Sequence, residues 1–146
     1  MSARTKARKR ALDLLYGADL RSESLAAAIA TEAERADSEP SRSSSWAYAR
    51  EIAEGIDAHL AEIDELIETF MQGWTISRMP AIDRAIVRIG IWELIFNPAV
   101  PDGVAIAEAV AAARSGISDA RFSIHHARFG AMAQTLADAG GAGIDG

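Results

Sequence analysis

The chain has 146 residues, of which 49% are hydrophobic and 25% charged, a composition that favours one globular domain over a disordered chain. It contains no Cys, which excludes disulfides, thiolate metal sites and cysteine nucleophiles and is typical of the reducing cytoplasm. No apolar run approaches the roughly 20 residues that span a bilayer, and no apolar segment follows the basic start, so we expect neither a membrane protein nor a secretory signal.

Charge is divided unevenly along the chain. The first ten residues contain five basic side chains and no acid: Arg4, Lys6, Arg8, Lys9 and Arg10. The formal net charge is −6, and residues 11–146 alone sum to −11, with ten basic and 21 acidic side chains. Proteins that coat nucleic acid are normally basic over a whole face. An acidic body with one basic end instead predicts local contact with phosphates.

Apolar residues at three- and four-residue spacing predict a first helix from Thr5 to about Arg21, in which Gly17 weakens the helix without ending it. Its apolar stripe consists of Ala7, Ala11, Leu14, Leu15 and Ala18. We expect four basic side chains to lie off this stripe: Arg4, Lys6, Arg10 and Arg21. Either Ser22 or Ser24 can cap a second helix, and a polar, Pro-containing loop over residues 38–45 follows it.

Ser45 is the expected cap of a long helical stretch that starts at Trp46, with a break at Gly55 or within residues 57–59. Residues 51–68 contain seven acids and no Lys or Arg. Such a charge run is usually a solvated face, and a docking face for a basic partner is the alternative.

Gly73 predicts the end of that stretch, and Pro80 suits the start of the next helix. Residues 81–96 are apolar nearly all round, which is typical of a central bundle helix. Two more helices are expected over residues 104–114 and from Ser118 to about Asp138. The fold class is therefore all-α: a compact bundle of six to seven helices in a single domain over residues 1–139, with a flexible Gly-rich tail over residues 140–146.

Patterns that would indicate catalysis or metal binding are missing. His125 and His126 are adjacent, so on a helix they lie about 100° apart and do not face one ion. Asp119 and His126 have near-helical spacing, but one carboxylate and one imidazole fall short of a site. There is no HExxH, no G-x-S-x-G and no phosphate-binding Gly loop. We therefore predict no enzyme, no cofactor and no metal.

The basic start carries the clearest chemical signal. Helical spacing of three and four residues allows a cationic stripe along the first helix, made of Arg4, Arg8 and Lys9 or of Lys6 and Arg10. Such a stripe can bind consecutive phosphates, and Arg planes can stack on unpaired bases. Tyr16, near the far end of that helix, could add an aromatic platform. The alternative is a basic solubilising terminus with Tyr16 in the core, and the residues alone leave both interpretations open.

Several blocks in order carry a family resemblance. They are Arg4–Tyr16, Ile63–Ile67, Gly73–Thr75, Arg78–Arg88, Trp92–Leu94, Val100-Pro101 and Val104–Val110. Over residues 4–114 the chain resembles the NusB family of bacterial transcription antitermination factors. It departs from the family pattern at Ala107, where Asn is usual, and after Asp119, where only Arg121-Phe122 and the pair Ile124-His125 correspond to the usual motif.

The resemblance implies an all-helical, non-enzymatic cytoplasmic protein that pairs with the small-subunit ribosomal protein NusE. The pair would bind the boxA element of nascent ribosomal RNA and act on the transcription elongation complex. By position, Arg4, Lys6 and Arg10 would contact RNA, with Arg8 and Lys9 in the same arm. Residues at the RNA or ribosomal-protein surface would be Tyr16, Asp83, Arg84 and Phe122.

Three alternatives stay open. A DNA-binding helix-turn-helix regulator would use residues 12–30, but its second helix is acidic, which is poor for a recognition helix. A helical protein-interaction module without RNA specificity is the second. A homodimer that covers the basic arm is the third, since Trp46 and Trp92 could supply apolar surface. An RNA methyltransferase would need a nucleotide-binding Gly motif that this chain lacks.

Overall fold

The structure, a computed structural model, describes residues 2–70 and 75–116. These residues form six α-helices, two short 3₁₀ turns and one π turn, and they contain no strand. The all-α prediction is confirmed. The chain divides into two compact units, Met1–Leu60 and Ala61–Gly146, each with its own packing. No helix among the described residues is long and apolar enough to cross a membrane.

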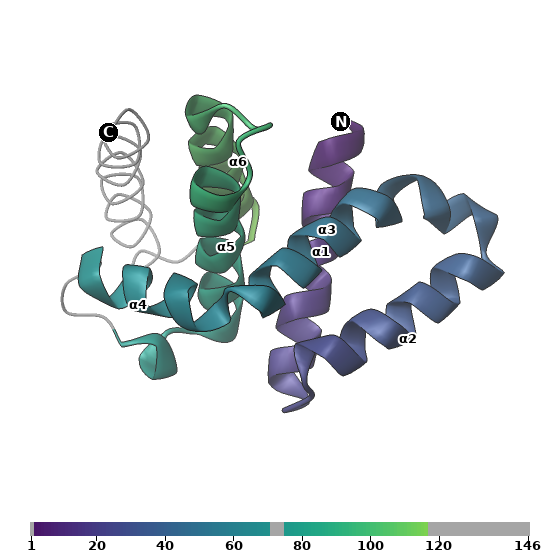
Figure 1. The fold of residues 1–146 in the computed structure, drawn as a ribbon, viewed down its shortest axis with the longest axis horizontal. Coiled ribbons are helices and arrows are strands. Elements are labelled where there is room, and N and C mark those ends of the chain that lie inside the picture. Colours follow the sequence, from purple (N-terminus) through teal and green to yellow (C-terminus); the bar gives the residue numbers. More distant parts are fainter. Residues whose placement is uncertain (1, 71–74, 117–146) are drawn as a thin grey trace. The chain divides into compact units, whose positions relative to one another are not determined.

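The first unit consists of α1 (Ala3–Leu20), α2 (Leu25–Ser38) and α3 (Ser43–Ala58), and each of these helices packs against the other two. Figure 1 shows α2 and α3 running in opposite directions. The buried face of α1 is made mostly of small side chains, which lets the helices approach closely. The buried hydrophobic residues of α1 are Ala7, Ala11, Leu15 and Ala18, and they pack with buried residues of α3 that include Ala49, Ile52, Ala53 and Ile56.

Serine hydroxyls cap the N-termini of two of these helices. Ser2 Oγ accepts a hydrogen bond from the backbone N–H of Thr5 at 3.1 Å, and Ser24 Oγ accepts one from Ala27 at 3.2 Å. Ser22, the other candidate cap, instead has a φ of +50°. It follows the C-cap of α1, where the backbone N–H of Glu23 donates to the carbonyl of Ala18 at 2.9 Å. This is a Schellman end, which needs a left-handed residue at that position.

The start of α3 differs from the sequence prediction. A 3₁₀ turn over Pro40–Arg42 leads directly into α3 at Ser43, so the predicted loop over residues 38–45 is mostly helical. Ser45 lies inside the first turn of α3, and its hydroxyl accepts a hydrogen bond from Arg10. The predicted break is confirmed: α3 ends at Ala58, and α4 (Leu60–Phe70) begins after the turn at His59.

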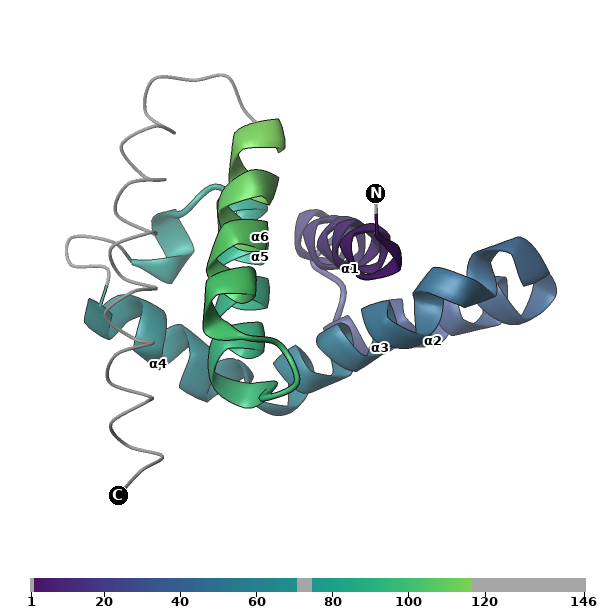
Figure 2. The ribbon, with the colours of Figure 1, turned by 90° about the horizontal axis from the view of Figure 1, so that it is seen from above.

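The second unit contains most of α4, the 3₁₀ turn Ile76–Arg78, α5 (Ala81–Ile91), the π turn Trp92–Phe96 and α6 (Asp102–Gly116). Pro80 precedes α5 as predicted, and most of α5 is buried. Figures 1 and 2 show α5 and α6 side by side, and they are in contact. The helix predicted after Ser118, the Gly-rich tail and the cap at Gly73 lie outside the described residues.

Candidate nucleic-acid interface

The five cations at the start of α1 point to different neighbours. Arg4 and Arg8 both extend toward α3, where their guanidinium carbons lie 4.8 and 5.9 Å from the centre of the Tyr48 ring. At these distances the ring attracts the cations. Arg4 stays exposed, whereas Arg8 is only 8% exposed. Arg8 therefore belongs to the packed face of α1.

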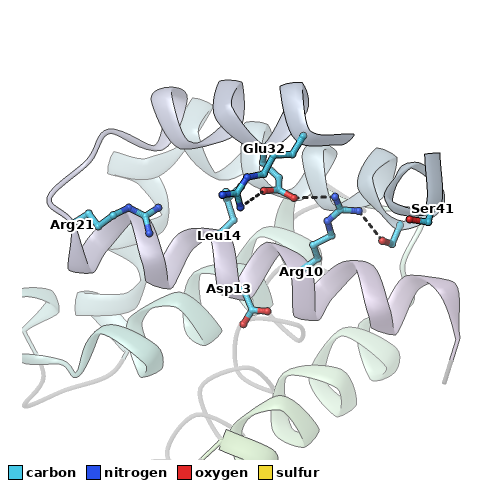
Figure 3. Close-up of a pocket in the computed structure, with 8 residues that line it drawn as sticks. Arg10, Asp13, Leu14, Arg21, Glu32 and Ser41 are labelled. Carbon is cyan, nitrogen blue, oxygen red and sulfur yellow. Dashed lines mark hydrogen bonds and ion pairs between the residues drawn. The ribbon is translucent and has the colours of Figure 1, made fainter. Parts of the chain in front are cut away.

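Arg10 ties α1 to both other helices of the unit. Its Nη1 donates to Ser45 Oγ and its Nη2 to Glu32 Oε1, both at 2.9 Å (Figure 3). Its guanidinium carbon lies 5.3 Å from the Trp46 ring centre. The Arg10 and Glu32 side chains are 17% and 14% exposed. Arg10 was expected to lie off the apolar stripe, yet it is packed, because α2 and α3 bring acceptors and an aromatic ring to it.

Lys6 and Lys9 remain available to solvent. Both are exposed, and neither forms an ion pair with any residue that the structure describes. Tyr16, seven residues after Lys9 and so on the same side of the helix, is half-buried. We refer to Arg4, Lys6 and Lys9 as the exposed arm cations. Because these three cations form no ion pair with another described residue, they can neutralise phosphates without breaking an existing pair.

Two arginines of α5, the predicted site residue Arg84 and its neighbour Arg88, stabilise the second unit. Arg88 makes a bidentate ion pair with Asp64 of α4, with N–O distances of 2.9 and 2.8 Å. Arg84 donates to the backbone carbonyl of Ile76 at 2.6 Å. Asp83, 5% exposed, lies in the first turn of α5, where the helix dipole favours a carboxylate. Phe122 lies outside the described residues.

The acidic run is a solvated face over most of its length. Six of its seven acids are exposed: Glu51, Glu54, Asp57, Glu62, Glu65 and Glu68. Asp64 is the exception, because it pairs with Arg88. The exposure of the other six lets a basic partner reach them.

Sequence reasoning missed the aromatic partners of the arm. Trp46 was predicted as the start of a helix, yet its ring lies close to Arg10, and the ring of Tyr48 lies close to Arg4. These pairs join residues 36–44 positions apart. Helical spacing identifies neighbours only three or four residues apart, so no local signal could have found them.

No group of three or more potential metal ligands occurs within residues 2–70 and 75–116. Of the three histidines, only His59 falls in these ranges; Asp119, His125 and His126 lie outside them.

Comparison with known proteins places these features in a family. The model of the NusB family matches residues 5–122. The "Transcription antitermination protein NusB" of Leifsonia xyli subsp. xyli (strain CTCB07) is 69% identical over 113 residues, which cover 77% of this chain and 78% of that protein.

Two solved structures share the fold. "T. maritima NusB, P3121, Form 2" superposes with a TM-score of 0.76 at 22% identity, covering 92% of this chain and 90% of that one. A chain of the "Crystal Structure of a Plectonemic RNA Supercoil" superposes with a TM-score of 0.75 at 25% identity, covering 95% of this chain and 96% of that one.

Proposed function

This chain belongs to the NusB family, and we propose that it is a transcription antitermination factor that binds single-stranded RNA through the exposed arm cations of α1. The observation that carries the proposal is their setting. Lys6 and Lys9 stand exposed on a helix that is held in place by Arg8 and Arg10, so their charges are available at a fixed spacing. The chain in the RNA supercoil structure has the same fold, which supports RNA as the ligand class.

Each arm cation has a role that suits its chemistry. Lys6 and Lys9 carry compact charges on flexible stems and would each neutralise a phosphate. Arg4 lies over the Tyr48 ring and stays exposed, so its N–H donors can reach a phosphate or a base. Arg8 and Arg10 belong to the proposed RNA-binding arm mainly as the residues that orient it. Tyr16 would stack on an unpaired base with the exposed part of its ring.

The proposal includes a protein partner. The exposed acids of α3 are complementary to a basic protein, and we assign this partner as the small-subunit ribosomal protein NusE. The pair would bind the boxA element of nascent ribosomal RNA on the elongation complex in the cytoplasm. Contacts to NusE through Tyr16, Asp83, Arg84 and Phe122 are part of this proposal. The protein would have no catalytic activity and no cofactor.

A transcription assay tests this function. It measures read-through, the fraction of transcripts that pass a terminator, on a template with a boxA element upstream of that terminator. The transcription reaction contains RNA polymerase, NusE and either the parent chain or a variant. We expect Lys6→Ala/Lys9→Ala to lower read-through. Arg50→Ala/Arg78→Ala removes the same charge from exposed arginines on α3 and on the 3₁₀ turn before α5, and should leave read-through at the parent level.

A second measurement tests the partner. NusE should tighten binding to boxA RNA more than binding to a scrambled RNA of the same length. An RNA affinity that is the same with and without NusE would contradict the pairing. A preference for duplex DNA over single-stranded RNA would favour the helix-turn-helix alternative instead.

A further inference from the structure

A pocket of about 460 Å³ opens beside α1 in the first unit (Figure 3). This volume is within the usual range of small-ligand sites. The lining includes three arginines, Arg10 of α1, Arg21 at its end and Arg35 of α2, and two carboxylates, Asp13 and Glu32. The lining is therefore polar and carries one net positive charge, which suits a ligand with both an anionic group and hydrogen-bonding edges.

Arg21 and Arg35 at the rim of the pocket are much more exposed than Arg10 inside it. Arg10 is fixed by Glu32 and Ser45, whereas the side chains of Arg21 and Arg35 are 63% and 65% exposed. Arg21 donates to Glu23 at 3.1 Å, and Arg35 lies 3.9 Å from Glu32 Oε2. A guanidinium has five N–H donors, so both groups can bind a further anion while keeping these pairs. Exposed pairs of this kind add little to stability, so the fold does not require this arrangement.

A glycine makes room for Arg21. The Nη1 atom of Arg21 lies 3.0 Å from where a Cβ on Gly17 would stand, so its guanidinium folds back along α1 over a position without a side chain. The absence of a side chain at Gly17 thus keeps the Arg21 charge beside the pocket.

The pocket continues the line of the exposed arm cations. Lys6 precedes Arg10 by four residues, which places it one turn away on the same face of α1. From Lys6 to Arg21 the helix extends roughly 22 Å. A strand whose phosphates meet Lys6 and Lys9 therefore reaches the pocket when it follows α1 toward its C-terminal end.

From this arrangement we infer that the pocket binds one unstacked nucleotide of single-stranded RNA, an inference that rests on the proposed function. The phosphate pairs with Arg21 and Arg35 at the rim. The base enters the space beside the Arg10–Glu32 pair, where the carboxylate and the guanidinium can meet its hydrogen-bonding edge. The pocket extends the RNA surface from the start of α1 to α2.

The test uses a fluorescently labelled, unstructured 12-nucleotide RNA and measures its affinity for the full chain from low to moderate salt. Replacing both rim arginines (Arg21→Ala/Arg35→Ala) should weaken binding about tenfold, the cost of removing one charge-assisted hydrogen bond. It should flatten the plot of log affinity against log salt by about 0.7, the value for one phosphate on a single strand. Gln at both positions should give the same result, and Lys should restore most of the slope.

The matched control is Arg50→Ala/Arg78→Ala, which removes two exposed guanidinium charges outside the pocket. Its effect should stay within about twofold, because neither side chain lines the pocket. In the parent, a hydrogen bond to Glu54 raises the pKa of Arg50, and an arginine is charged at the pH of the experiment even without such a shift.

Two outcomes would overturn the inference. If Lys6→Ala/Lys9→Ala weakens RNA binding but the rim variants match the control, the pocket takes no nucleotide while the proposed function stands. If the parent chain binds no RNA with or without NusE, the proposed function fails and the pocket assignment falls with it.

Discussion

The two units differ in how their cations are used. In the second unit, Arg84 and Arg88 donate to a backbone carbonyl and to a carboxylate of the same unit. In the first unit, Arg10 is held in the same manner, but Lys6 and Lys9 on the same helix are exposed and form no ion pair with described residues. The contrast teaches that a cation is available to a partner where its side chain stays exposed, and not where the fold packs it against its acceptors. Sequence spacing does not distinguish the two situations.

The largest effect is expected where an arginine serves only the fold. Arg88→Ala removes both hydrogen bonds to Asp64 and leaves that carboxylate half-buried without its partner. We expect the free energy of unfolding in urea to fall by about 2–3 kcal/mol, below the cost for a fully buried pair because both side chains keep some solvent contact. Asp64→Asn in the same background should add little further loss. A free energy of unfolding unchanged within about 0.5 kcal/mol, the scale of a neutral surface substitution, would show that Arg88 does not stabilise the second unit, and the contrast between the units would then fail.

An intermediate effect is expected at Arg10, which resembles Arg88 in its contacts although it lies among the cations of the proposed RNA-binding arm. Arg10→Ala removes two hydrogen bonds and the packing on the Trp46 ring, while Glu32 keeps Arg35 nearby. We expect a decrease of about 1–2 kcal/mol in unfolding free energy. The salt dependence of RNA affinity should not change. A flattened salt slope with unchanged stability would instead assign Arg10 to a phosphate.

The smallest effect concerns the turn that ends α1. Ser22 has a left-handed backbone conformation with a φ of +50°, which glycine adopts without steric cost. Ser22→Gly should therefore raise the unfolding free energy by about 0.5–1 kcal/mol. RNA affinity should stay the same, because Ser22 carries no charge. A loss of stability would show that the Ser22 side chain makes a contribution larger than the strain.

Much of the fold could be predicted from local patterns. The spacing of Ala7, Ala11 and Leu15 identified α1 through Gly17, Ser24 was one of two proposed caps of α2, and the break between α3 and α4 falls at His59 within the predicted segment. Each of these depends on residues within a turn or two of one another. The start of α3 was predicted wrongly because Ser45, a good cap by type, accepts its hydrogen bond from Arg10.

The candidate site was predicted in composition but not in detail. The basic start of α1 was identified, yet the separation of exposed Lys6 and Lys9 from the packed Arg8 and Arg10 could not be. That separation depends on Glu32, Ser45 and Tyr48, which are 22–40 residues further along the chain. Only the packing of α2 and α3 against α1 brings them together.

The salt dependence of RNA affinity tests the central claim most directly, that the exposed cations of α1 bind RNA while the packed ones support the helix. A labelled, unstructured RNA is titrated at several salt concentrations with the parent, Lys6→Ala/Lys9→Ala and Arg10→Ala. We expect the lysine variant to flatten the slope by about 1.4, or about 0.7 for each phosphate that is no longer neutralised, and Arg10→Ala to keep the parent slope. An unchanged slope for the lysine variant, with a flattened slope for Arg10→Ala, would contradict the account.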